Sequence, residues 1–215
     1  VIVNGTIEYV LSNATVNGKP VSGNTVVIAP SSNFASFNIE ANYKKYYLIS
    51  ISSPVPVTVS TYNESVTTTS FTEWLPSGSI VSIVVPSTYV LSNGTRLVYM
   101  GSNESLMVSE PISMAITEFA RQYLVSIASQ YLISINGTET TQYTEWFSPG
   151  TMLTIAPATI FSNGVFISEP GYSITVNGPI NMAVQWQVNW VLTAALYAAI
   201  ALVVIAVVIT ALRRW

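Results

Sequence analysis

The segment from Val191 to Leu212 is a run of twenty-two residues without a charged side chain. A helix rises about 1.5 Å per residue, so this run would be roughly 33 Å long, close to the bilayer's hydrocarbon core of about 30 Å. A helix buried inside a soluble domain is rarely this long and apolar on every face. The sequence therefore predicts one transmembrane helix within residues 189–212.

Tryptophans flank this segment on both sides, and two arginines follow it: Trp186, Trp190, Arg213, Arg214 and Trp215. Indole rings prefer the membrane interface, and arginines beside a span favour the cytoplasmic side. We therefore predict a single-pass protein of a cell membrane or virion envelope, with its N-terminus outside and residues 213–215 as a cytoplasmic tail. A removable C-terminal anchoring signal is the alternative, and the terminal Arg-Arg-Trp argues against it.

The composition of the chain removes most catalytic chemistry. It contains no Cys, His or Asp, and all ten acidic residues are Glu. Triads, thiolate nucleophiles and most zinc sites are excluded on this ground. We therefore expect no enzyme activity, no cofactor, no metal site and no catalytic residue. Residues 1–190 are acidic overall and hold no groove-reading motif, so we expect no nucleic-acid partner.

Internal repeats organise the part of the chain before the apolar segment. Four pairs of segments match: Tyr47–Ile51 with Tyr123–Ile127, Glu73–Ile83 with Glu145–Ile155, Val108–Pro111 with Ile167–Pro170, and Pro111–Ile116 with Pro179–Val184. Matches that recur in one order indicate a duplicated unit. We therefore predict one repeat over residues 43–119 and a second over 120–188.

The start of the chain resembles the later part of a repeat. Tyr9–Thr15 mirrors Tyr89–Thr95, so residues 1–42 are predicted to form a partial unit that lacks its front half. Two explanations are open for this missing half. Either the sequence is a fragment of a longer chain, or the half-unit borrows strands from another subunit, since unpaired strand edges need cover. No signal peptide is visible at Val1, and we expect Val1 to be a processed end.

Short alternating segments separated by turn signals fill both repeats. Tyr47–Ser52 and Tyr131–Asn136 alternate apolar and polar residues, and Ser92-Asn-Gly94 is one of several turn signals. This pattern predicts an all-β fold of tandem Ig-like β-sandwich domains followed by the transmembrane helix. The link Val188-Asn-Trp190 is too short and lacks the Gly or Pro of a flexible tether. We therefore expect the last domain to sit directly on the bilayer.

Two glutamates invite a catalytic interpretation, because a pair of carboxylates can cleave glycosides. Glu73 and Glu145, however, occupy the same place in two repeats, so they are expected to lie far apart. We interpret each as a structural residue that precedes a tryptophan at a strand edge.

Six Asn-X-Ser/Thr sequons lie before the apolar segment, at Asn4, Asn13, Asn63, Asn93, Asn103 and Asn136. Most sit beside Gly or Glu in contexts typical of turns, where a glycan is tolerated. We predict that these asparagines carry N-glycans.

The Tyr-Leu-Ile-Ser-Ile strands, the Glu-Trp-x-x-x-Gly segments, the Ser-Asn-Gly turns and the Arg213-Arg214 tail together give the chain a resemblance to a known kind of protein. It resembles the β-sandwich-repeat, C-terminally anchored surface proteins of thermoacidophilic archaea, such as the membrane anchor of their surface layer. Envelope proteins of the viruses of these hosts have a similar composition. The chain departs from the surface-layer anchors because it lacks a long coiled-coil stalk before the membrane.

Three functions follow as hypotheses. The first is a non-catalytic, glycosylated structural protein that assembles into a cell-surface layer, envelope or appendage base through its β-edges, as a homo- or hetero-oligomer with other surface proteins. The second is an accessory single-pass subunit of a larger membrane complex, because Ala194, Ala195, Ala198, Ala199 and Ala201 give the span small side chains suited to helix packing. A carbohydrate-binding adhesin is a third hypothesis.

Overall fold

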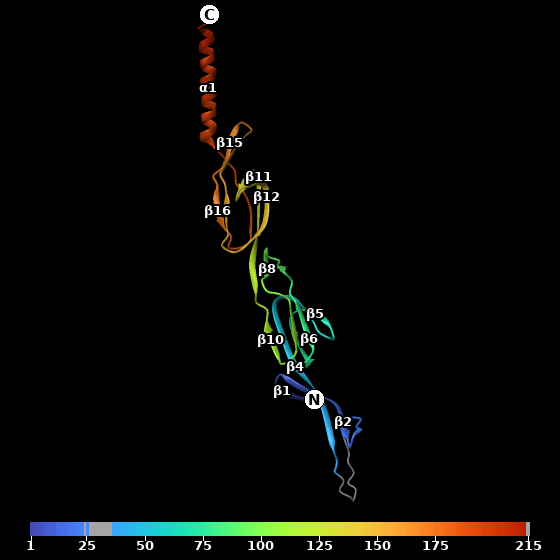
Figure 1. Cartoon of the computed structure of the whole chain (residues 1–215). Coiled ribbons are helices and arrows are strands. Elements are labelled where there is room, and N and C mark those ends of the chain that lie inside the picture. The colour runs from blue at the N-terminus through green and yellow to red at the C-terminus, as the bar shows by residue number, and fades with distance from the viewer. Residues whose placement is uncertain (24, 26–35, 214–215) are drawn as a thin grey trace. The chain divides into compact units, whose positions relative to one another are not determined.

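The protein is mainly β, with three largely antiparallel sheets and one C-terminal helix (Figure 1). The computed structural model describes residues 1–23, 25 and 36–213, and within them it has eighteen strands. The predicted β-rich fold and the single apolar C-terminal helix are both confirmed.

The strands are β1 (Ile2–Asn4), β2 (Ile7–Val16), β3 (Lys19–Pro20), β4 (Ile39–Ser60), β5 (Ser65–Pro76), β6 (Ile80–Val84), β7 (Thr88–Val90), β8 (Thr95–Tyr99), β9 (Glu104–Met107), β10 (Ile112–Ala115), β11 (Phe119–Ile135), β12 (Thr138–Phe147), β13 (Met152–Ile155), β14 (Ala158–Ser162), β15 (Val165–Glu169), β16 (Tyr172–Thr175), β17 (Ile180–Ala183) and β18 (Gln187–Val188). The helix α1 spans Trp190–Leu212.

The chain divides into two compact units by its internal contacts. Unit 1 comprises Val1–Tyr89 and Tyr99–Phe119, and unit 2 comprises Val90–Val98 and Ala120–Trp215. The N-terminal strands therefore belong to the same unit as the first repeat, since β2 pairs with the long strand β4. The segment 90–98 lies within the first repeat in sequence but belongs to unit 2 by its contacts.

The two repeats have the same strand pairing. In unit 1, β4 pairs with β5 so that Leu48 lies opposite Trp74, and in unit 2, β11 pairs with β12 so that Leu124 lies opposite Trp146. Each long strand also carries a parallel neighbour, β10 on β4 and β17 on β11. Three of the four matched pairs of sequence segments therefore correspond to matched backbone positions.

One of the four sequence matches does not reflect structural equivalence. Gly78 N–H donates to the carbonyl oxygen of Val108 at 2.8 Å, and the equivalent Gly150 N–H donates to that of Val176 at 2.8 Å. Val108 therefore corresponds to Val176, and not to Ile167 as the shared Ser-Glu-Pro sequence suggests. The segment Ile167–Pro170 instead ends strand β15, in a hairpin that approaches the helix.

Alternating side chains build the core of each unit. The buried residues on β4 occupy alternate positions and so point to one face, because successive side chains of a strand alternate. They are Tyr47, Ile49, Ile51, Val55, Val57 and Val59. The cluster in unit 2 contains the corresponding β11 residues: Val125, Ile127, Ile133 and Ile135. Both long strands shift register at the same place, after Ser52 and after Ala128. The buried side chains continue to alternate in the second half of each strand.

The helix α1 has 23 residues and a mean hydropathy of 2.8 over its most apolar window. Asn189 caps its N-terminus, because the Asn189 side-chain oxygen accepts a hydrogen bond from Leu192 N–H. Of its residues from Trp190 to Leu212, only Thr193 is buried. It is the one candidate membrane span among the residues that the structure describes.

Candidate membrane-anchoring site

A β-hairpin of unit 2 meets the first two turns of the helix. Strands β14 and β15 pair antiparallel, with Ser162 opposite Val165 at the tip, and the turn between them is Asn163-Gly164. Asn163 has φ +50° and Gly164 has φ +81°, as a two-residue turn that matches strand twist requires. The rings of Phe161 and Phe166 lie 5.1 Å apart across the pair. The hairpin is therefore a well-formed element with an aromatic pair near its tip.

Three hydrogen bonds join Gly164 and Phe166 of this hairpin to the start of the helix. The Tyr197 hydroxyl donates to the carbonyl oxygen of Gly164 at 2.8 Å. Phe166 N–H donates to Thr193 Oγ1 at 3.0 Å, and the Phe166 carbonyl oxygen accepts from Asn189 N–H at 2.7 Å. Backbone groups that would otherwise lack a partner beside an apolar helix are thus satisfied. We call this set of contacts the hairpin–helix junction.

The link between the last sheet and the helix is part of this junction. Val188 pairs with Ile167 as a strand residue of β18. Asn189 caps the helix with its Oδ1 atom, and its Nδ2 atom donates to Ser168 Oγ at 3.1 Å. Val188, Asn189 and Trp190 therefore each belong to a strand, a helix cap or the helix, and this link does not act as a flexible tether.

The polar side chains of the apolar segment all have partners. Thr193, Tyr197 and Thr210 are the hydrogen-bonding side chains between Val191 and Leu212. Thr193 and Tyr197 bond to the hairpin, whereas Thr210 Oγ1 donates to the Ala206 carbonyl oxygen within the helix at 2.7 Å. The helix can therefore enter a medium without water while leaving no hydroxyl unpaired.

The residues predicted at the membrane interface lie in different environments. Trp190 is the first residue of the helix and is 70% exposed. Trp186 packs against the unit 2 core, with its Nε1–H donating to Ser129 Oγ at 3.0 Å and its ring 5.2 Å from that of Tyr131. Arg213 ends the helix. Arg214 and Trp215 lie outside the described residues, and the interfacial role of all five stays a prediction.

The six sequon asparagines are all exposed: Asn4, Asn13, Asn63, Asn93, Asn103 and Asn136. In three of them, Asn93, Asn103 and Asn136, the side-chain oxygen accepts a backbone N–H. Such a bond orients the side chain and leaves the nitrogen, which would carry a glycan, free to point outward. Glycosylation itself stays a prediction.

The segment 90–98 is held in unit 2 by a contact that the sequence did not predict. Arg96 Nε–H donates to Gln122 Oε1 at 2.7 Å, and its guanidinium lies 4.8 Å from the centre of the Trp146 ring. The Gly94 carbonyl oxygen accepts from Leu124 N–H at 2.9 Å. The sequence feature that marks this contact is the Ser92-Asn-Gly94 turn, which recurs at Ser162-Asn-Gly164. In both turns the glycine carbonyl oxygen accepts a hydrogen bond from a later element of the chain.

A hollow of about 240 Å³ lies within unit 1, bordered by Tyr99, Glu104 and Glu118. Burial raises the pKa of the Tyr99 hydroxyl, and the nearby Glu118 carboxylate adds to the rise. Ile116 N–H bonds to Ser52 as Val184 N–H bonds to Ala128, so Glu118 corresponds to Trp186. Unit 2 therefore has an indole, that of Trp186, at the position where this hollow in unit 1 is bordered by a glutamate.

The two glutamates that precede tryptophans bond locally within their own units. Glu73 Oε1 accepts from Asn63 Nδ2 at 3.4 Å. Glu145 Oε2 accepts from the Tyr143 hydroxyl at 2.9 Å. Burial, and then this hydrogen bond, raises the pKa of Tyr143 to about 12. One oxygen of each carboxylate therefore has a partner nearby, whereas Glu73 Oε2 is buried without a hydrogen-bond partner among the described residues.

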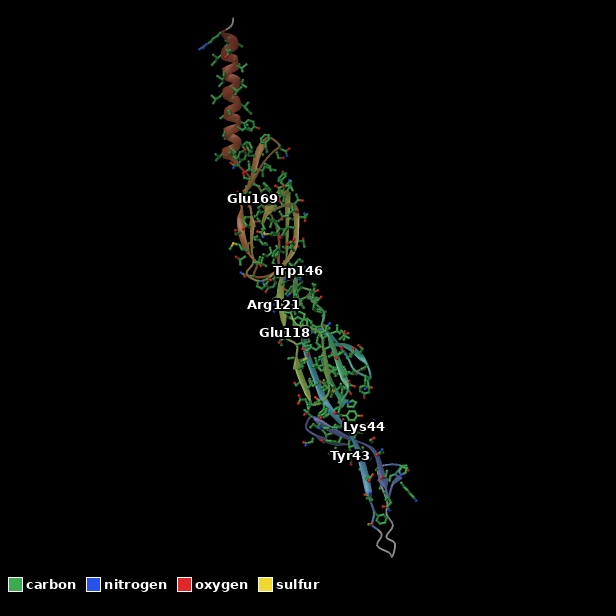
Figure 2. The ribbon with its side chains drawn as sticks, in the orientation of Figure 1. Tyr43, Lys44, Glu118, Arg121, Trp146 and Glu169 are labelled. Carbon is green, nitrogen blue, oxygen red and sulfur yellow. The ribbon has the colours of Figure 1, made fainter. Side chains whose placement is uncertain are left out.

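Glu169 lies at the base of the hairpin (Figure 2) and is buried, with an exposed fraction of 3%. Its Oε1 atom accepts from Gly171 N–H at 3.3 Å. Gly171 has φ +74° and a Cβ there would collide with Pro157, so the backbone is tightly turned at this point. The turn directs the chain from β15 into β16 and so fixes the base of the hairpin.

Comparison of the chain with protein-family models, with curated proteins and with solved structures gave no match.

Proposed function

We propose that this chain is a non-catalytic, membrane-anchored structural protein of an extracytoplasmic surface. The observation that carries the proposal is the hairpin–helix junction, in which Asn189, Thr193 and Tyr197 bond the last β-unit directly to an apolar helix of 23 residues. A helix with this length and exposure needs lipid around it. A bonded junction, unlike a tether, transmits the orientation of the β-unit to the membrane.

The finer features of the proposal come from the sequence. The Arg213-Arg214 pair supports an N-terminus outside and a C-terminus in the cytoplasm. The duplicated pairing of β4 and β11 supports tandem Ig-like sandwiches, and the exposed sequons support a glycoprotein. The chain is proposed to be of the same kind as the surface-layer anchors of thermoacidophilic archaea or the envelope proteins of their viruses. Its composition and its Glu-Trp-x-x-x-Gly segments support this proposal.

Protease protection tests the topology. Sealed right-side-out vesicles that carry the full chain are treated with an external protease, and we expect digestion of everything before the helix. Protection of residues 1–188 would contradict the proposed orientation. Recovery of the whole chain in the soluble fraction after carbonate extraction would contradict the anchor itself.

Assembly is tested by purification from native membranes in mild detergent. Self-association, or association with other surface proteins, is the expected result for a lattice or envelope component. Co-migration with redox or transport subunits would instead favour the accessory-subunit function, for which the alanines of the span provide a packing face. A dispersed monomer in native membranes would contradict the assembly proposal.

A further inference from the structure

The tip of the β14–β15 hairpin lies level with the second turn of the helix. Tyr197, which bonds to Gly164 at the tip, is seven residues beyond Trp190, or about 10 Å along the axis at about 1.5 Å per residue. A hydrocarbon core of about 30 Å takes about 20 helical residues, which counted back from Leu212 begin at Thr193. A hairpin bonded to Thr193 and Tyr197 therefore reaches the outer boundary of that core.

The side chains at this tip suit a lipid environment. Phe161 is 55% exposed although it is a large aromatic residue. Phe166 and Val165 follow the turn on β15, and the neighbouring Ile160 is also apolar. Aromatic rings are enriched at the level of the lipid headgroups, and interfacial elements bury their apolar face about 5–10 Å into the headgroup and acyl boundary.

The equivalent turn in the first repeat has a different character. Alignment on the shared Ser-Asn-Gly sequence pairs the following positions: Leu91 with Phe161, Thr95 with Val165, and Arg96 with Phe166. Each change makes the later hairpin more apolar or more aromatic. The loss of Thr95 also removes the sequon, so Asn93 lies in one and Asn163 does not. Both changes favour a hairpin that enters lipid, because apolar and aromatic side chains suit the membrane interface and a glycan does not.

We infer that the β14–β15 hairpin is a second membrane contact, which inserts Phe161 and its neighbours into the outer interface of the bilayer beside helix α1. This inference rests on the proposed membrane anchor. Two contacts, a span and a bonded hairpin, restrict both the tilt and the rotation of unit 2 about the helix axis, which a lone helix does not.

Site-directed labelling tests the inference on the full chain, because the absence of cysteine makes every introduced thiol unique. Single variants Thr159→Cys, Phe161→Cys, Met152→Cys and Val204→Cys carry a nitroxide label in phosphatidylcholine vesicles. Met152 is 64% exposed on β13 and serves as the aqueous control, and Val204 reports on the span. For each label, collision with lipid-soluble oxygen is compared with collision with a water-soluble nickel complex.

We expect the label at position 161 to favour oxygen over nickel, the label at 159 to favour it less, and the label at 152 to favour nickel. A water-exposed label at 161 together with a lipid-exposed label at 204 would overturn the hairpin inference and leave the anchor intact. A label at 161 that is shielded from both reagents would also overturn it, because protein and not lipid would then cover the tip. A water-exposed label at 204 would overturn the anchor itself.

Discussion

The hydroxyl of Tyr197 lies 2.8 Å from the carbonyl oxygen of Gly164, and this bond ties the second turn of an apolar helix to the tip of a hairpin 33 residues earlier in the chain. Few side chains of the span can hydrogen-bond, and this one is directed at a turn carbonyl. The position of the hairpin on the helix is therefore determined by a specific bond and not only by the length of the link.

Replacement of Tyr197 by Phe removes this bond and keeps the ring. A net hydrogen bond contributes about 0.5–1.5 kcal/mol, so we expect a comparable loss of junction stability. Hydrogen exchange of the full chain in detergent measures it, through faster exchange of hairpin amides around Gly164. Thr210→Val is the control, because Thr210 bonds only within the helix. Equal effects of the two changes would contradict a specific role for Tyr197.

Thr193 is the only buried residue of the helix, and Thr193→Val leaves Phe166 N–H without its partner. An unsatisfied buried donor costs about 1–3 kcal/mol, more than the loss of an exposed bond. We expect a lower thermal midpoint for unit 2 of the variant, followed by circular dichroism. Thr193→Ser keeps the hydroxyl and should restore most of the loss. If Ser and Val behave alike, the hydroxyl is not the cause.

Comparison of Gly164→Ala with Gly137→Ala distinguishes the cost of backbone strain from the cost of contact with the helix. Gly164 and Gly137 both have positive φ, at +81° and +84°. A Cβ at 164 would lie 3.0 Å from the Tyr197 hydroxyl, whereas a Cβ at 137 meets nothing within 4 Å. Both alanine variants bear a backbone cost of about 1 kcal/mol, and we expect the larger total loss at 164. Equal losses in the free energy of unfolding, measured by chemical denaturation, would show that the Tyr197 side chain moves away from the new methyl group at no cost.

Arg96→Ala should release the segment 90–98 from unit 2. The variant loses the bond to Gln122 and the contact with Trp146, and a cation–π contact alone contributes about 0.5–1 kcal/mol at an exposed site. Limited proteolysis between residues 90 and 98 measures the release. Arg121→Ala removes the same charge from an exposed position and should leave the cleavage rate unchanged. Faster cleavage in both variants would indicate a general effect of charge.

Alkaline pH should destabilise unit 2 through Tyr143. Its pKa in the folded protein is about 12, raised first by burial and then by Glu145, against an ordinary value of about 10. The folded state therefore favours the neutral phenol, and this contribution to stability is complete below about pH 10 and is lost as the pH rises towards 12. Tyr143→Phe should flatten the decline of stability over this range, and the exposed Tyr62→Phe should not.

Sequence patterns were enough to predict the β-rich fold and the single apolar helix, because both follow from periodicity along the chain. Alternation on β4 and β11 marks buried strand faces, and Val191–Leu212 has no charged residue. The repeat was visible because equivalent strands keep equivalent residues, as at Trp74 and Trp146.

The tertiary structure decided what short matches left open. The Ser-Glu-Pro sequence that ends β15 looks like the one after Val108, yet backbone bonds make Val176 the equivalent of Val108. The assignment of residues 90–98 to unit 2 and the bonding of Gly164 to Tyr197 depend on contacts between residues distant in sequence. Local periodicity determines which element a segment forms, whereas long-range hydrogen bonds and packing determine which partner it meets.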